Sequence, residues 1–170
     1  MTNPTVGIKI ILGAAALMGA LALSGAASAQ QTPGPAAGSF GIGIEAGQPS
    51  GATAKYWLDE NSAIDAGLGE SNGNAALHAD LVWHAWNVVP QPQMGKLGVY
   101  FGAGPRLEFA TDTEFAVRTF VGVSYWLSGH PVELFAEVGP VFQMTQGGDV
   151  YPDGAAGARF YFNWRGPGSR

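Results

Sequence analysis

The sequence predicts an all-β domain in which eight antiparallel strands close into an up-and-down barrel. After residue 38, nearly every hydrophobic stretch alternates with period two, as in FGIGIEAG over residues 40–47, so that one face carries no charge and the other carries glycines and charged groups. Such alternation is typical of strands whose two faces meet unlike environments. Turn-forming residues separate about eight of these stretches, and none has the 3.6-residue period of an amphipathic helix.

The N-terminus does not share this pattern. Lys9 precedes an apolar run, Ile10–Leu23, which is followed by the small residues Ala27–Ala29. This order predicts a secretory signal over residues 1–29, and the run is short for a transmembrane anchor. We expect a flexible lead-in over residues 30–38, a barrel over 39–163 and a periplasmic tail over 164–170.

Composition excludes several classes of protein. Removal of Lys9 with the signal changes the formal net charge from −5 to −6, which disfavours binding to nucleic acid. The chain has no cysteine, so an exported domain of this kind needs a core or a closed hydrogen-bond network instead of disulfides.

Each expected strand is bounded by turn-forming residues. The first four are Phe40–Gly47 before QPSG, Ala52–Leu58 before DEN, Ser62–Gly69 before ESNGN, and Ala76–Asn87 before the break PQPQMG. The last four are Lys96–Arg106, Glu114–Leu127, Val132–Phe142 after SGH, and Ala155–Phe162 after the Gly- and Asp-rich residues 146–154. Consecutive strands joined by short turns pair as antiparallel neighbours.

Periodicity leaves open which face points inward. A soluble lipocalin-like calyx would have its apolar face inside, whereas an outer-membrane barrel would turn that face to lipid. Glycines on the polar face suit the crowded interior of a narrow barrel. Only 12% of the residues are charged, and about a quarter is usual in soluble domains. These observations favour a transmembrane β-barrel.

The aromatic residues support the same orientation. If the chain enters from the periplasm, all five tryptophans fall at one rim, as in the aromatic girdle at a membrane interface. The predicted periplasmic girdle consists of Tyr56, Trp57, Trp83, Trp86, Tyr125, Trp126 and Trp164.

The end of the last strand resembles the C-terminal assembly signal of outer-membrane proteins. Gly157 is followed at three and five residues by Phe160 and Phe162, although residues 163–170 come after them. The whole mature chain resembles the small eight-stranded barrels of the OmpA and OmpX type, and residues 47–65 resemble a group of small bacterial barrels of no stated activity. The resemblance implies the outer membrane of a Gram-negative bacterium, with membrane lipid, lipopolysaccharide and the barrel-assembly machinery as partners.

The polar face predicts a network of charges in the lumen. Lys55 is expected across from Asp65, and Arg159 is expected to reach Glu45 and Glu137. Charges in a narrow barrel must be paired, so the lumen should be plugged. The predicted network consists of Glu45, Lys55, Asp65, Asp80, Arg118, Glu137 and Arg159. A structural or surface-interaction role follows, with a narrow ion or small-solute channel as the alternative; the resemblance implies a closed or fluctuating pore.

A lipid A-modifying enzyme is a further alternative. His78 and Asp80 share the polar face, but neither Ser124 nor Ser71 is expected within reach of a base. Two histidines six residues apart do not make a metal site, so we expect no enzymatic activity, no cofactor and no metal. The loops Leu107–Thr113 and Met144–Gly154 are expected to form an acidic outer rim.

Overall fold

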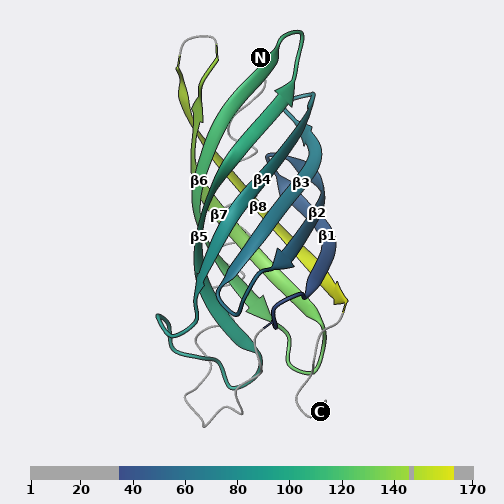
Figure 1. The fold of residues 1–170 in the computed structure, drawn as a ribbon, viewed down its shortest axis with the longest axis vertical. Coiled ribbons are helices and arrows are strands. Elements are labelled where there is room, and N and C mark those ends of the chain that lie inside the picture. Colours follow the sequence, from purple (N-terminus) through teal and green to yellow (C-terminus); the bar gives the residue numbers. More distant parts are fainter. Residues whose placement is uncertain (1–34, 146–147, 163–170) are drawn as a thin grey trace.

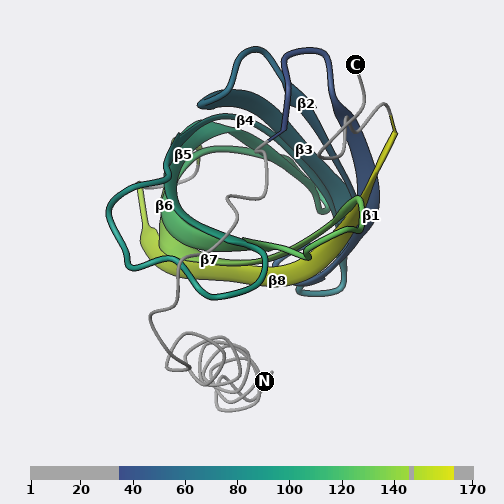
Figure 2. The same cartoon turned by 90° about the horizontal axis from the view of Figure 1, so that it is seen from below.

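The computed structural model describes residues 35–145 and 148–162 and shows one closed barrel. Its eight strands follow the chain order around the barrel, and β1 pairs with β8 to close it (Figures 1 and 2). The strands are β1 (Phe40–Gly47), β2 (Ser50–Trp57), β3 (Ser62–Ser71), β4 (Asn74–Ala85), β5 (Lys96–Phe109), β6 (Thr113–Trp126), β7 (Val132–Gln143) and β8 (Val150–Phe162). Every pairing is antiparallel, so the predicted fold class is confirmed.

No helix in residues 35–145 and 148–162 is long and apolar enough to cross a membrane.

The period-two alternation forms the strands and separates two surfaces. Ile44 lies on the outer surface with 73% of its area exposed, whereas Lys55 lies inside with 0% exposed. The outer surface also carries Phe40, Ile42, Ile64, Leu68, Leu81, Trp83, Phe101, Val121, Val138, Phe160 and Phe162. The apolar face therefore points outward and the charged face points into the lumen, which is opposite to the order of a lipocalin-like calyx.

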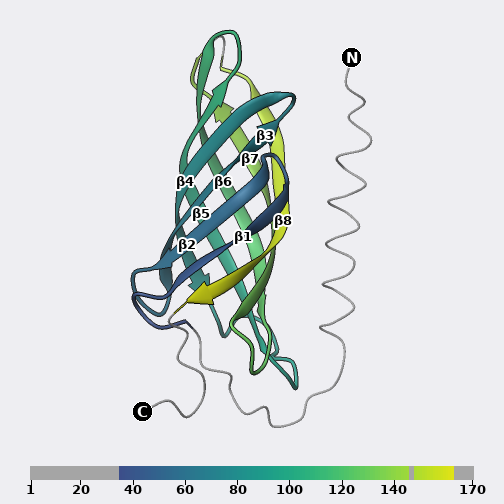
Figure 3. The ribbon, with the colours of Figure 1, turned by 90° about the vertical axis from the view of Figure 1, so that its right-hand side faces the viewer.

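Several strands extend further than the sequence predicts. β5 continues from Arg106 to Phe109, and β8 begins at Val150 instead of Ala155. Pairing with a neighbour carries both extensions, because Leu107 lies opposite Phe115 and Pro152 lies opposite Pro140. The predicted outer loops, residues 107–113 and 144–154, are accordingly too long. The hairpins β5–β6 and β7–β8 rise above the β1–β2 turn and make the wall uneven in height (Figures 1 and 3).

The hydrogen-bonded ladder lapses at two Gly-Pro steps. In the β4–β5 pair the register is interrupted opposite Gly104-Pro105, and in the β6–β7 pair opposite Gly139-Pro140. Proline has no N–H to donate across the pair. The glycines let the strands approach closely, since a Cβ at Gly139 would overlap the carbonyl oxygen of Thr119. The wall is thus least bonded at these two steps.

Candidate functional site: the charged lumen

The charged residues of the lumen form two groups. The near cluster lies toward the end of the barrel where β1 begins and β8 ends, and it consists of Lys55, Asp65, Glu133 and Arg159. The far cluster lies toward the opposite end and consists of Glu45, His78, Asp80, Arg106, Glu108, Arg118, Glu137 and Asp153. Each of the eight strands contributes at least one side chain to these clusters, and β7 and β8 contribute to both.

The near cluster is closely paired. Lys55 Nζ lies 3.2 Å from Glu133 Oε1 and 4.0 Å from Asp65 Oδ2. Arg159 Nη2 lies 2.8 Å from Asp65 Oδ2, and its Nη1 lies 3.4 Å from Glu133 Oε2. The hydroxyl of Thr53 accepts hydrogen bonds from Arg159 Nε at 3.1 Å and Nη2 at 2.8 Å. Each charge in this cluster therefore meets two opposite charges.

Aromatic side chains cover the near cluster on the side of the barrel's near end. Trp57, Trp126 and Tyr161 form a buried core with Ala63, and Trp86 packs against it. Tyr161 donates a hydrogen bond of 2.6 Å to Glu133 and accepts one of 3.3 Å from Trp57 Nε1. We call this group the aromatic floor, and it consists of Trp57, Trp86, Trp126 and Tyr161. The hydrogen bond from Tyr161 to Glu133 connects the floor to the ion pairs of the near cluster.

The floor corrects the predicted girdle. Trp57 and Trp126 are 0% and 1% exposed and point inward, as does the partly buried Trp86, so they do not face outward at the rim. Their positions have the same parity as Lys55, Arg118 and His84, all of which face the lumen. Of the remaining predicted residues, Tyr56 and Trp83 are 45% and 39% exposed on the outside, Tyr125 donates a hydrogen bond to the carbonyl of Met94, and Trp164 lies outside the described residues.

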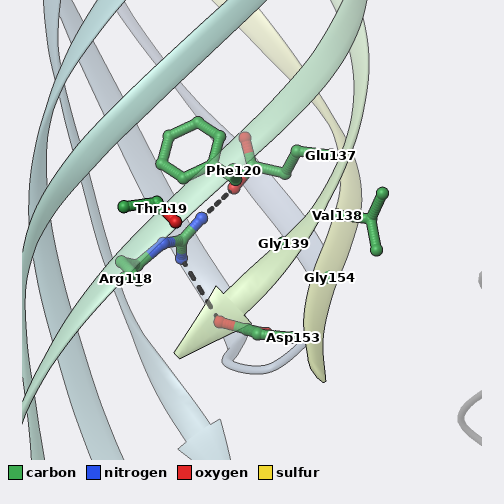
Figure 4. Close-up of a pocket in the computed structure, with 8 residues that line it drawn as sticks. All are labelled: Arg118, Thr119, Phe120, Glu137, Val138, Gly139, Asp153 and Gly154. Atoms are coloured by element: carbon green, nitrogen blue, oxygen red, sulfur yellow. Dashed lines mark hydrogen bonds and ion pairs between the residues drawn. The ribbon is translucent and has the colours of Figure 1, made fainter. Parts of the chain in front are cut away.

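Arg118 is the centre of the far cluster. Its Nη2 donates to Glu137 Oε1, its Nε lies 3.6 Å from Asp80 Oδ2, and its Nη1 lies 3.7 Å from Asp153 Oδ2. Figure 4 shows Glu137 and Asp153 on either side of this guanidinium. A small hollow beside Gly139 is lined by Arg118, Glu137 and Asp153.

Arg106 ties the far cluster to the turns above it. Its Nη1 donates to Asp153 at 2.8 Å and to the backbone carbonyl of Gln48 at 3.0 Å. Its Nη2 donates to the Ser71 hydroxyl at 2.6 Å and to Glu108 at 3.3 Å. One side chain of β5 thus holds the β1–β2 turn, the end of β3 and the start of β8.

The structure places all seven predicted network residues in the lumen, in different pairs from those expected. Lys55 and Asp65 are register partners, as predicted. Arg159 does not reach Glu45 or Glu137; its carboxylate partners are Asp65 and Glu133. The reason is register, because Arg159 lies opposite Glu133 and two residues away from the level of Glu45.

Four charged residues of the lumen were missing from that prediction, namely Arg106, Glu108, Glu133 and Asp153. Each has the inward parity of its strand. Arg106 and Glu133 lie within the predicted strands, and continuing the alternation beyond the predicted ends reaches Glu108 and Asp153. Glu108 and Asp153 were instead assigned to outer loops, because the predicted strands β5 and β8 ended too early.

The two clusters differ in net charge. The near cluster has two cations, Lys55 and Arg159, for two carboxylates. The far cluster has five carboxylates and two guanidinium groups, with His78 as the remaining titratable group. Buried charges without a partner of opposite sign are energetically unfavourable. The near cluster is balanced, whereas the far cluster needs additional positive charge.

The candidate catalytic residues contact charged groups. His78 lies between Asp80 and Glu45, and His84 Nε2 lies 3.2 Å from Lys55 Nζ. Ser71 accepts from Arg106. Within residues 35–145 and 148–162, no group of three His, Cys, Asp or Glu side chains is arranged to hold a metal ion.

The predicted assembly signal lies in the seam that closes the barrel. Phe160 and Phe162 are 49% and 45% exposed on the outer surface, and the Phe162 ring stacks on Phe40 of β1 with centroids 6.4 Å apart. Gly157 faces inward, where a Cβ would collide with the ring of Phe135.

Comparison with known proteins identifies a relative in fold. No protein-family model matches the sequence, and no curated protein matches it. The crystal structure of the N-terminal β-barrel domain of Pseudomonas aeruginosa OprF superposes with a TM-score of 0.55 at 16% sequence identity, covering 78% of this chain and 100% of that one. The two chains share the barrel fold, which confirms the predicted resemblance at the level of fold.

Proposed function

We propose that this chain is an outer-membrane barrel with a structural or surface-interaction role and a lumen closed by its own side chains. The observation that carries the proposal is the polarity of the barrel, with apolar residues outside and ion pairs inside. In water this arrangement would expose large apolar side chains on every strand, whereas lipid would cover them. A closed barrel also satisfies the backbone without an exposed edge.

Both clusters and the aromatic floor support a closed lumen. Charged side chains from non-adjacent strands meet inside the barrel, as when Lys55 of β2 contacts Glu133 of β7. Below them Trp57 and Trp126 pack edge to face, with centroids 6.2 Å apart. A general porin needs an open aqueous channel, and a filled eight-stranded interior does not provide one. We therefore favour a structural role over the narrow-channel alternative.

The location and partners follow from the same proposal. Residues 1–29 direct export, the outward aromatics of β8 are recognised by the barrel-assembly machinery, and the outer surface contacts lipid and lipopolysaccharide. The described turns at the far end are short, with Gln48-Pro49 between β1 and β2 and Asn72-Gly73 between β3 and β4. Short turns support a structural role more than capture of a large ligand. We assign no enzymatic activity, because His78 and Asp80 are engaged in the far cluster.

Membrane placement is tested by fractionation together with gel mobility. The full chain, expressed in a Gram-negative host, should sediment with outer membranes and migrate faster in detergent gels before boiling than after it. A replacement of outward Ile44 by Asp should reduce the fraction of barrel that inserts into the membrane, while the conservative Ile44→Val should preserve it. A soluble periplasmic protein with no heat-dependent mobility would contradict the proposal.

Closure of the lumen is tested in planar bilayers. The wild-type barrel should show no steady conductance, and Arg159→Ala, which removes a group spanning the near cluster, should introduce measurable current. Arg159→Lys keeps a positive charge at this position and serves as the matched control. Steady ohmic conductance of the wild type would favour the channel instead.

A further inference from the structure

His78 occupies an unusual position between two buried carboxylates. Its Nδ1 lies 2.7 Å from Asp80 Oδ2, and its Nε2 lies 3.4 Å from Glu45 Oε1. A neutral imidazole has a proton on one ring nitrogen only, so the other nitrogen would present a lone pair to a carboxylate. Only the doubly protonated ring donates to both residues.

Glu45 depends on this contact. Both its side chain and that of His78 are nearly fully buried, and Glu45 Oε2 has no hydrogen-bond partner among the described residues. Within that part of the chain, His78 is the group that forms an ion pair with Glu45. A neutral His78 would leave the Glu45 carboxylate buried without a compensating charge, which is energetically unfavourable.

The backbone makes room for the contact. Gly67 of β3 is the register partner of His78, and a Cβ at Gly67 would collide with both His78 Nε2 and Glu45 Oε1. The glycine therefore permits a histidine on β4 to meet a carboxylate on β1 across the intervening strands.

The surroundings of His78 contain both cations and carboxylates, and the carboxylates are more numerous. Arg106 lies opposite it in the β4–β5 register, and Arg118 pairs with Asp80, so two cations oppose protonation. The charged and titratable groups that face this part of the lumen are Glu45 of β1, Lys55 of β2, Asp65 of β3, Asp80 and His84 of β4, Tyr100, Arg106 and Glu108 of β5, Arg118 of β6, Glu137 of β7, and Asp153 and Arg159 of β8. Lys55 and Arg159 are balanced by Asp65 and Glu133 within the near cluster. The five carboxylates of the far cluster exceed its two guanidinium groups.

We propose that His78 is a proton-binding latch of the far lumen, which holds Glu45 of β1 and Asp80 of β4 together while it carries a proton on each ring nitrogen. Loss of either proton leaves one hydrogen bond and releases one carboxylate; Nδ1 keeps its shorter bond to Asp80, so Glu45 is released. The far half of the lumen thereby becomes sensitive to alkaline pH. The latch does not require that the barrel lie in a membrane, so its failure and the failure of the proposed location are separate outcomes.

The protonation state is measured directly by ¹⁵N NMR of the imidazole nitrogens in the folded, detergent-solubilised barrel. The chain has three histidines, His78, His84 and His130, and single replacements of each by glutamine assign the signals. At about pH 7.5, a solvent-exposed imidazole is mostly neutral. We expect both His78 nitrogens to be protonated under these conditions. A neutral tautomer of His78 at that pH would overturn the proposal.

The consequence for folding is measured by urea unfolding between about pH 7 and about pH 9, a range that begins above the pKa of about 6.5 of an ordinary imidazole. In the wild type and in the control His130→Gln, the urea midpoint should fall as the pH rises. In His78→Gln that fall should be reduced by more than about half, since no proton can be lost at this position. If His78→Gln does not fold, Glu45→Gln provides the second variant, in which His78 should lose its second proton at lower pH. An unchanged pH dependence in the folded variant, or an unchanged His78 titration in Glu45→Gln, would overturn the latch.

Discussion

The two halves of the lumen are stabilised in different ways. In the near half, two cations and two carboxylates are balanced and lie on a floor of packed aromatic rings. In the far half, five carboxylates share two guanidinium groups and His78, and the hydrogen-bonded wall is interrupted at two Gly-Pro steps. The same barrel wall thus supports a neutral, tightly packed end and an acidic end that depends on ion pairs.

Arg118 explains how the far half remains closed where its wall is interrupted. Asp80 lies on β4 beside the interruption at Gly104, and Glu137 lies on β7 two residues before Gly139. Arg118 pairs with both carboxylates and also with Asp153 of β8. One guanidinium therefore links strands on both sides of the two interruptions, which identifies it as the principal cross-lumen connection of the far half.

The largest effect is expected from Arg118→Met. The replacement keeps an unbranched chain but leaves Asp80, Glu137 and Asp153 with less positive charge in a cluster that is already acidic. Removing one partner of a buried ion pair costs about 3–5 kcal/mol, and the loss here should lie toward the upper end. Urea unfolding followed by tryptophan fluorescence in lipid vesicles measures the change in the free energy of unfolding.

Arg118→Lys is the matched control, because it retains the charge and loses the planar fork that serves several carboxylates. It should be intermediate in stability. Equal stability of Arg118→Met and the wild type would show that the far half does not depend on this connection.

The next effect distinguishes the charge balance of the two halves. Glu133→Gln in the near cluster leaves Lys55 and Arg159 with one carboxylate, and it should cost about 3 kcal/mol. Asp153→Asn removes one of the five carboxylates of the far cluster, and Arg106 and Arg118 still form ion pairs with Glu108 and Glu137. The free energy of unfolding should therefore fall by about 1 kcal/mol or less. Both free energies of unfolding are compared at neutral pH. A reversed order would show that net charge does not distinguish the clusters.

Sequence reasoning predicted the wall better than the lumen. Alternation with period two is a property of each strand, and it was sufficient for the eight antiparallel strands and the inward direction of residues such as Lys55 and Arg118. Which side chains pair across the lumen depends on the stagger between strands. The alternation within a single strand does not predict this stagger. Arg159 was therefore matched with Glu45 and Glu137 although its register places it beside Glu133.

The aromatic residues show a different limitation. The aromatic residues at the near end predict an interfacial girdle that includes Trp57 and Trp126. The alternation within their strands predicts instead that both side chains point inward, which is where the structure places them. Aromatic rings are favoured both at membrane interfaces and in packed interiors, so their presence at a rim does not fix their direction. Within a strand, parity decides the direction of every side chain, aromatic or not.

A smaller effect should test the link between the aromatic floor and the near cluster. Tyr161→Phe removes the hydroxyl that donates to Glu133 and accepts from Trp57, and it leaves the ring in place. A hydrogen bond to a charged group contributes about 1.5–3 kcal/mol to stability. Because Glu133 retains its ion pairs with Lys55 and Arg159, the expected loss of unfolding free energy is about 1–2 kcal/mol. Tyr100→Phe, which removes a donor to Glu137 of the far cluster, is the comparison. Because the far cluster has more carboxylates than cations, Tyr100→Phe should lose at least as much unfolding free energy as Tyr161→Phe. If neither variant is less stable than the wild type, these hydroxyls do not stabilise either half of the lumen.

The smallest effect lies outside the lumen, in the turn between β2 and β3 at the near end. The carboxylate of Asp59 accepts hydrogen bonds from the backbone N–H groups of Asn61 at 2.7 Å and Ser62 at 2.8 Å, and these donors lower the pKa of Asp59. A lowered pKa contributes stability above the unfolded value of about 3.9, and this contribution is lost as the pH falls through the folded pKa. Asp59→Ala should therefore unfold at slightly lower urea than the wild type at about pH 6, and the difference should shrink toward about pH 2. Asp59→Asn is the control, because it retains an acceptor oxygen without a titrating group. The difference in stability between Asp59→Asn and Asp59→Ala should therefore persist at acid pH. If the difference between the wild type and Asp59→Ala does not change with pH, the carboxylate charge does not stabilise the turn.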